Sequence, residues 1–239
     1  MHRFFVKPED IGEAYITLSP ETIKHIQVLR LTADEEIVLC DGLGTDFICT
    51  VEAPHAKIIH KIPSEGEAKV ACHVYLALSK GERLEWAIQK SVELGAASIS
   101  LFASQRAIAK FDQKTLPKKC ARFTQIALEA SKQAGRGIVP TISYFPSLQK
   151  AVDTVPKNQV GLFFYELEGE NKLSKILAGQ KQTEQFHLFI GPEGGFSHEE
   201  VEIANKAGFS SVSLGKRILR CETAPVAALA AFMFWANEF

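Results

Sequence analysis

The segment from Leu188 to Ser197 constrains the fold of this chain more than any other part. An apolar run ends there in the turn 191–195 (Gly-Pro-Glu-Gly-Gly), and a helix start follows at once. Gly194 and Gly195 can adopt backbone angles closed to other residues, and they leave room for a ligand. Ser197 followed by Glu200 predicts a capping box. This combination is typical of a small-ligand site in an α/β sheet, although a plain strand-to-helix connection has the same pattern.

Residues 1–67 are predicted to be rich in β-strands. Strands are expected over 36–41, 46–51 and 56–62, with one inserted helix from Glu21 to Leu29 capped by Ser19. Short strands joined by glycine turns favour a small barrel. The segment 63–67 (Pro-Ser-Glu-Gly-Glu) has the composition of a linker, so we place a domain boundary there.

Residues 68–239 are predicted to alternate between strands and helices. The expected strands are 70–78, 98–103, 160–165, 186–190 and 211–214, and the expected helices are 82–94, 118–134, 199–207 and 223–237. Such alternation is the mark of an α/β domain with a mostly parallel sheet and helices on its faces.

The last predicted helix has no polar face. From Ala224 to Trp235 every residue is apolar, and a helix of this kind must be buried on every side. We expect that burial in a homodimer formed through this helix. A central core helix within one chain is the alternative.

The composition is that of a soluble cytoplasmic protein. The 239 residues are 46% hydrophobic and 23% charged, and no apolar run approaches the roughly 20 residues of a membrane span. The first residues lack a signal-peptide core. Five cysteines without a C-x-x-C pair favour free thiols in a reducing compartment. The seven histidines show no ligand spacing, so we expect neither a metal ion nor a membrane partner.

The charges are unevenly distributed although the net charge is only −1. Between Lys80 and Gly137 eleven Lys or Arg face five acids, so this segment carries +6 and the rest −7. The asymmetry indicates either a surface for nucleic-acid phosphates or helix faces that lysine and arginine merely solvate. Arg136, flanked by two glycines, is suited either to contact a phosphate group or to interact with the C-terminal end of the preceding helix.

Three predicted loops could meet at one edge of the sheet. They follow Phe164-Tyr165-Glu166, form the turn 191–195, and span 214–223. In the third loop Arg220 and Glu222 precede the apolar helix, where a charged pair serves either a site or a local ion pair. The chain contains neither a P-loop nor a G-x-G-x-x-G fingerprint. The glycine turn is therefore expected to hold a neutral or cationic cofactor through backbone groups.

These residues resemble the RsmE family, bacterial small-subunit rRNA uridine N3-methyltransferases of the SPOUT superfamily. The resemblance spans nearly the whole chain, and Cys221 departs from the threonine usual in the family. The motifs that carry it are 25–31 with Asp41-Gly42, 89–95, 127–133 with Arg136 and Pro140, 190–197 and 214–224.

The resemblance implies a PUA-like N-terminal β-barrel over 1–67 and a trefoil-knotted SPOUT α/β methyltransferase domain over 68–239. It also implies a dimer, S-adenosyl-L-methionine as cofactor, and methylation of N3 of one uridine in 16S rRNA within the 30S subunit.

Site residues follow as hypotheses. Arg220 would stabilise negative charge developing on a uracil oxygen, and Glu193 or Glu222 would accept the N3 proton. For rRNA contact we expect Arg30, Lys90, Arg106 and Arg136. The residues expected around the cofactor are Tyr165, Gly191, Glu193, Gly194, Gly195, Leu214, Gly215, Ile218, Leu219 and Thr223.

Two other functions fit the same sequence. One is an RNA-binding assembly factor that keeps the fold without catalysis. The other is a small-molecule enzyme whose glycine loop holds a nucleotide; RNA binding that weakens steeply with salt would argue against it.

Overall fold

The computed structural model describes residues 1–112, 114–181 and 185–239 and divides into two compact units. The first unit comprises Met1–Glu67 with Ser131–Val139, and the second comprises Ala68–Ala130 with Pro140–Phe239. The segment Ser131–Val139 falls inside the predicted second domain, yet its contacts belong to the first unit.

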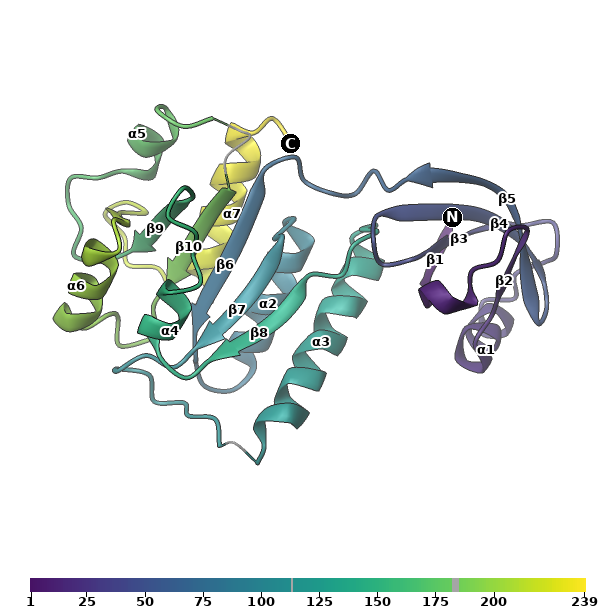
Figure 1. Cartoon of the computed structure of the whole chain (residues 1–239), viewed down its shortest axis with the longest axis horizontal. Coiled ribbons are helices and arrows are strands. Elements are labelled where there is room, and N and C mark those ends of the chain that lie inside the picture. The colour runs from purple at the N-terminus through teal and green to yellow at the C-terminus, as the bar shows by residue number, and fades with distance from the viewer. Residues whose placement is uncertain (113, 182–184) are drawn as a thin grey trace. The chain divides into compact units, whose positions relative to one another are not determined.

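The first unit is built on a mixed five-stranded sheet (Figure 1). The strand order is β1-β3-β4-β5-β2; β1 runs parallel to β3, and the other neighbours are antiparallel. Its elements are β1 (His2–Phe5), a 3₁₀ turn η1 (Pro8–Asp10), β2 (Tyr15–Thr17), α1 (Pro20–Val28), β3 (Glu36–Cys40), β4 (Thr45–Glu52) and β5 (His55–Pro63).

One side of this sheet and α1 enclose an apolar core. Ile16, Ile37 and Leu39 are fully buried there, and Ile26 of α1 packs against them. Ser19 caps α1 as predicted, because its side chain accepts a hydrogen bond from the Thr22 backbone at 3.1 Å.

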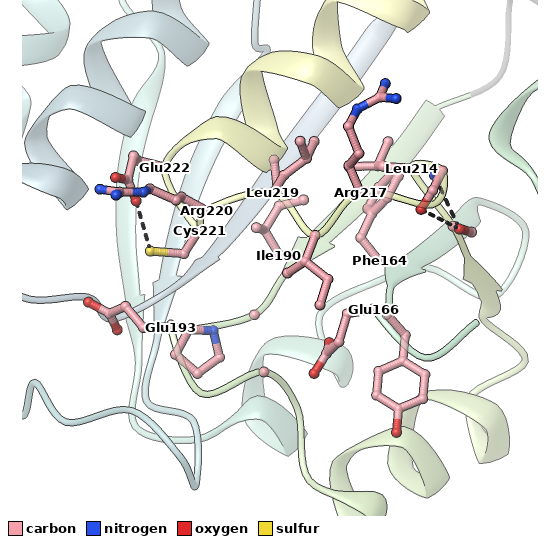
Figure 2. A pocket seen from close by; sticks show the side chains of 18 of the residues that line it. Phe164, Glu166, Ile190, Glu193, Leu214, Arg217, Leu219, Arg220, Cys221 and Glu222 are labelled. Atoms are coloured by element: carbon pink, nitrogen blue, oxygen red, sulfur yellow. Dashed lines mark hydrogen bonds between the residues drawn. The ribbon is translucent and has the colours of Figure 1, made fainter. Parts of the chain in front are cut away.

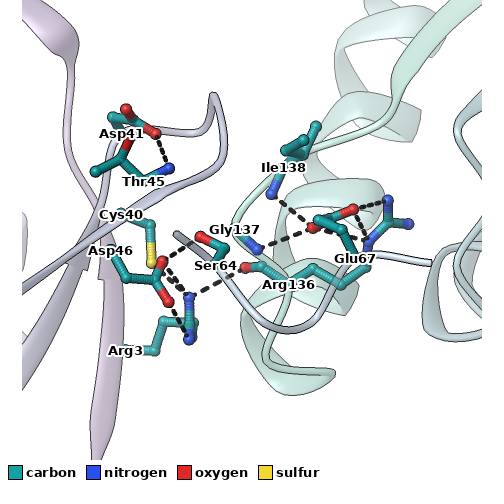
Figure 3. A network of polar contacts seen from close by, with 10 residues as sticks. All are labelled: Arg3, Cys40, Asp41, Thr45, Asp46, Ser64, Glu67, Arg136, Gly137 and Ile138. Atoms are coloured by element: carbon teal, nitrogen blue, oxygen red, sulfur yellow. Dashed lines mark hydrogen bonds and ion pairs between the residues drawn. The ribbon is translucent and has the colours of Figure 1, made fainter. Parts of the chain in front are cut away.

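A polar network fixes the segment 131–139 to the rest of the first unit (Figure 3). Glu67 accepts hydrogen bonds from the backbone of Gly137 and Ile138, and its Oε2 lies 2.7 Å from Nη2 of Arg136. Arg3 donates to both oxygens of Asp46, at 2.9 and 2.8 Å, and to the carbonyl of Arg136. Burial opposes ionisation of Asp46, but the bonds from Arg3 and Ser64 outweigh it and lower its pKa.

The second unit is a six-stranded, wholly parallel sheet in the order β11-β9-β10-β6-β7-β8. Its strands are β6 (Ala71–Ala77), β7 (Ser98–Phe102), β8 (Thr141–Phe145), β9 (Val160–Phe164), β10 (Gln185–Ile190) and β11 (Ser210–Val212). Its helices are α2 (Glu82–Glu93), α3 (Leu116–Gln133), α4 (Leu148–Val152), α5 (Leu173–Leu177), α6 (His198–Lys206) and α7 (Thr223–Trp235), of which α3 ends in the first unit.

Helices cover both faces of this sheet (Figure 1). On one face α7 packs on β10 and β6 and against α2, and Phe186 of β10 meets Phe232 of α7 at 4.8 Å between ring centroids. On the other face α4 packs beside α6, and Phe163 and Phe189 are fully buried beneath them. The parallel α/β architecture predicted for this part is confirmed.

Most predicted elements are present with ends shifted by a few residues. Glycine ends two helices, because Gly95 and Gly208 adopt positive φ after α2 and α6. The missed elements are short: β1, β2 and the edge strand β8 have mixed polarity, and α4 and α5 have five residues each. So few residues do not establish a helical period.

Helix α7 is not buried on every side within one chain. Its buried residues are Pro225, Ala228, Leu229, Phe232 and Met233, whereas Phe234 is 75% exposed. The prediction of complete burial is wrong for the single chain. The sheet covers one face of α7, and the homodimer stays a prediction.

Two histidines on neighbouring strands of the second unit, one on β6 and one on β10, stack on each other. The rings of His73 and His187 lie 4.8 Å apart, and His187 is 4% exposed. Nε2 of His187 donates to Gln159 Oε1, so Nδ1 accepts from the Tyr75 hydroxyl at 3.2 Å. Burial and the neighbouring His73 lower the pKa of His187 to about 4.

Replacing Glu67 by alanine should destabilise the first unit by about 3 kcal/mol, because a buried guanidinium loses its carboxylate. The side chain of Arg136 is 3% exposed. Urea unfolding followed by circular dichroism measures the change. Glu65→Ala, which removes an exposed carboxylate from the same connection, is the control and should be nearly neutral; equal effects would contradict the structural role of Glu67.

The buried neutral His187 should make stability depend on pH. A group whose folded pKa is depressed binds protons better in the unfolded chain. Its contribution is therefore complete above pH 6.5 and is lost as pH falls toward about 4. In urea unfolding from pH 7 to 4.5, His187→Gln should be less stable at pH 7 but decline less steeply than wild type. The exposed His198→Gln should keep the wild-type slope, and a steep slope in His187→Gln would argue against this origin.

Candidate functional site

Three loops meet in one pocket at the carboxyl ends of β9, β10 and β11 (Figure 2). The pocket has a volume of about 490 Å³, within the usual range for small-molecule sites. It is lined by 164–166, 190–195 and 212–222 together with Arg83 and Ala224. The meeting of these loops, predicted from the sequence, is observed.

The glycines of the turn after β10 are required by their surroundings. Gly195 has φ +66°, and a Cβ there would overlap the carboxylate of Glu166. At Gly191 a Cβ would lie 3.1 Å from the ring of Phe196. Side chains at 191 and 195 are therefore disfavoured, and the backbone at these positions forms part of the pocket lining.

The predicted capping box behind this turn is present. Glu200 donates its backbone N–H to Ser197 Oγ at 3.2 Å, and its carboxylate accepts from the Ser197 backbone at 3.0 Å. The start of α6 is thereby fixed directly after the pocket-lining glycines.

The loop between β11 and α7 forms the most exposed wall. Gly215 has φ +107°, and its N–H donates to Ser213 Oγ at 3.2 Å. Ile218 is 82% exposed although it lines the pocket, and Arg220 is also exposed. The Arg220 carbonyl accepts from the backbone of Thr223 and Ala224, each at 2.9 Å, which begins α7.

Arg83 joins two carboxylates at one side of the pocket. Its Nη1 donates to Glu193 Oε1 at 3.3 Å, and its Nε lies 3.9 Å from Glu222 Oε1. Glu193 Oε1 also accepts from the backbone N–H of Lys80 at 3.1 Å. Both predicted acids are thus held by one guanidinium that the sequence analysis did not assign to the site.

Cys221 and Glu222 form a hydrogen-bonded pair in which the thiol donates. Burial, the contact with Glu222 and the charges of Glu193 and Glu222 raise the pKa of Cys221 to about 12. Its Sγ lies 3.3 Å from Glu222 Oε2. Burial opposes ionisation of Glu222, but hydrogen bonds from its own backbone N–H and from Cys221, with the charges of Arg83 and Arg220, lower its pKa overall. Cys221 stays protonated, Glu222 stays ionised, and the thiol can donate as a threonine hydroxyl would.

The structure brings most of the predicted cofactor residues together. All except Thr223 line the pocket, as do Arg220, Glu193 and Glu222. Thr223 instead begins α7 and is outside the lining. Glu166 and Arg83 line the pocket but were missed. The position of Arg83 follows from the topology. Helix α2 comes directly after β6, which lies beside the parallel strand β10, so the connections after these two strands lie at the same edge of the sheet.

The four predicted RNA-contacting residues have different environments. Arg30 is exposed in the first unit, Lys90 is half-buried and bonded to Glu93 at 2.8 Å, and exposed Arg106 donates to the Gly194 carbonyl at 3.3 Å. The expectation for Arg136 is not supported, because its guanidinium is buried and bound by Glu67. Arg136 follows Gly135, whose positive φ reverses the chain after α3, and its side chain is directed into the interior.

Within the described ranges, His, Cys, Asp and Glu side chains form no cluster of three that could hold a metal ion. In the same part of the chain, no helix is long and apolar enough to cross a membrane.

Comparison with known proteins gives consistent matches. Residues 66–233 match the model of an RNA methyltransferase domain, and residues 18–63 match that of an RNA methyltransferase PUA domain. Ribosomal RNA small subunit methyltransferase E of Bacillus subtilis is 31% identical over 98% of this chain and 96% of its own length. The enzyme of that name from Mesomycoplasma hyopneumoniae is 33% identical over 95% and 96%.

A solved structure is similar over the same extent. The crystal structure of ribosomal RNA small subunit methyltransferase E from Neisseria gonorrhoeae, bound to S-adenosyl methionine, has a TM-score of 0.86 and 33% identity, with 98% of this chain and 97% of that one covered. The chain therefore belongs to the ribosomal RNA small subunit methyltransferase E family, RsmE, as the sequence motifs indicated.

Proposed function

We propose that this protein transfers a methyl group from S-adenosyl-L-methionine to N3 of a uridine in 16S rRNA, with the 30S subunit as substrate. The observation that carries the proposal is the glycine-lined pocket at the ends of β9, β10 and β11. A family member with 33% identity binds S-adenosyl methionine.

The residues of the pocket fit that cofactor. Leu214 and Leu219 offer apolar surface for an adenine ring, and the glycines at 191, 194 and 195 leave their backbone groups accessible. Glu166, Glu193 and Glu222 provide negative charge at the lining, which suits a cationic sulfonium. We assign cofactor binding to these positions together with Tyr165, Gly215 and Ile218.

The chain's own residues would position uracil and manage its charge. S-adenosyl-L-methionine, when bound, supplies an electrophilic methyl group on a sulfonium sulfur. Uracil N3 carries a proton that must leave, and negative charge then develops on the ring oxygens. The exposed guanidinium of Arg220 offers donors for such an oxygen, and Glu193 or Glu222 accepts the proton directly or through water. Arg83 keeps both carboxylates at this side of the pocket.

The remaining assignments rest on the family resemblance and on surface character. We assign rRNA contact to Arg30, Lys90 and Arg106, and a homodimer contact to the exposed side of α7 around Phe234. The trefoil knot and a cytoplasmic location are also inferred from the resemblance.

Gly195→Ala should weaken cofactor binding without unfolding the protein. The φ of +66° at this position costs alanine about 1–2 kcal/mol, and the Glu166 carboxylate must move to admit the added methyl group. Calorimetric titration should show at least a tenfold loss of affinity, about 1.4 kcal/mol. Gly179→Ala is the control, because a Cβ there meets only the Ile176 carbonyl at 3.7 Å. Unchanged affinity in Gly195→Ala would exclude this turn as the cofactor site.

Cells lacking this protein should contain 16S rRNA that misses one methyl group on a uridine. Mass mapping of the rRNA locates it, and the intact gene should restore it. Arg220→Ala should fail to restore it while the purified variant still binds cofactor and 30S subunits, because donors to one oxyanion contribute about 100- to 1,000-fold in rate. Lys206→Ala, which removes an exposed positive charge outside the pocket lining, is the control. An RNA-binding factor without catalysis would leave the rRNA mass unchanged in the deletion strain.

A further inference from the structure

Glu200 binds two separate backbone segments through its two carboxylate oxygens. The residue is 2% exposed. Its Oε2 accepts from the N–H of Ser197 at 3.0 Å, and its Oε1 accepts from the N–H of Gln105 at 3.0 Å. A capping box needs only the first of these bonds. The second bond joins the helix start to another segment of the chain.

The second bond attaches the segment 104–106, which follows β7, to the start of α6. A further contact joins this segment to the glycine turn itself, because Arg106 Nη1 donates to the Gly194 carbonyl at 3.3 Å. A Cβ on Gly194 would lie 3.2 Å from Cβ of Arg106 and 3.3 Å from its carbonyl oxygen. The segment therefore lies directly against the pocket-lining turn.

The chain that continues from this segment is strongly basic. Between Arg106 and Lys119 the described residues carry five positive charges and one acid, Asp112. Arg106, Lys110, Lys114 and Lys118 are exposed, and Nζ of Lys119 lies 4.0 Å from the ring centroid of Phe111. An exposed basic segment of this kind fits RNA phosphates.

We propose that Glu200 is a positioning residue that couples occupancy of the pocket to the affinity for RNA. This inference rests on the proposed function. A ligand that orders the turn 191–195 also orders the start of α6, and the bonds of Glu200 and Arg106 extend that order to the basic segment. RNA then binds a surface that has less conformational freedom to lose, which gives positive cooperativity between cofactor and RNA.

Glu200→Gln separates the two bonds. Glutamine is accepted at this position of a capping box, but its amide has only one acceptor oxygen, and its NH₂ would face a backbone donor. The variant can keep the bond to Ser197 and lose the bond to Gln105. Glu202→Gln is the matched control, since it removes one exposed negative charge from the same helix, where that carboxylate pairs with Lys206.

The affinity of fluorescently labelled protein for 30S subunits from cells lacking the enzyme is measured by anisotropy, with and without S-adenosylhomocysteine. Wild type and Glu202→Gln should bind about fivefold more tightly with it, the lower end of usual coupling. In Glu200→Gln the difference should fall below about twofold, while the affinity for S-adenosylhomocysteine alone changes little.

Hydrogen exchange in the wild-type protein gives a test that needs no variant. S-adenosylhomocysteine should slow exchange of the Gln105 amide, although this residue is not among those lining the pocket. Unchanged exchange, equal wild-type affinity with and without the ligand, or full coupling in Glu200→Gln would each overturn the inference. Loss of coupling together with loss of the capped helix in Glu200→Gln would overturn the separate role of Glu200. Failure of wild type to bind S-adenosylhomocysteine or to methylate rRNA would instead overturn the proposed function.

Discussion

The positive φ of Gly195, +66°, is the backbone constraint on which the pocket-lining turn depends. Neighbouring parallel strands β9 and β10 end at the same edge, so the loops that follow them compete for the same space. The Glu166 carboxylate occupies the position that a side chain at 195 would need. The tip of that exposed side chain can move aside, so the φ of +66° is what makes any residue other than glycine costly at this position.

Two arginines near helix ends have different roles in this chain. Arg136 follows α3 and Arg220 precedes α7, and from the sequence both were expected to contact a ligand. Arg136 is buried and has Glu67 as a bidentate partner, which offsets the cost of removing its charge from water. Arg220 is exposed at a pocket where Arg83 binds Glu193 and Glu222, and its own charge also helps to lower the pKa of Glu222. Its exposed guanidinium keeps donors available for an incoming anionic group.

The sequence predicted local features well where a short pattern determines the structure. The capping box at Ser197 and Glu200, the cap at Ser19 and the alternation of the second unit each depend on neighbouring residues. The inward turn of Arg136 and the position of Arg83 depend on partners far along the chain, Glu67 and Glu193. No local pattern encodes such a partner. The five-residue helices α4 and α5 were missed because packing, not periodicity, maintains them.

The third loop, between β11 and α7, exposes an apolar side chain, Ile218, to water at the pocket. Its side chain is 82% exposed in the lining of a pocket, where water contacts apolar surface at a cost of about 25 cal/mol per Å². The loop is fixed at both ends, by Ser213 with Gly215 and by the Arg220 carbonyl at the start of α7. A ligand that covers Ile218 removes that surface from water without reorganising the anchors. The same binding event would hold Arg220, two residues further on, at the mouth of the pocket. Apolar binding energy from one part of a ligand can in this way be used to position a charged group for another.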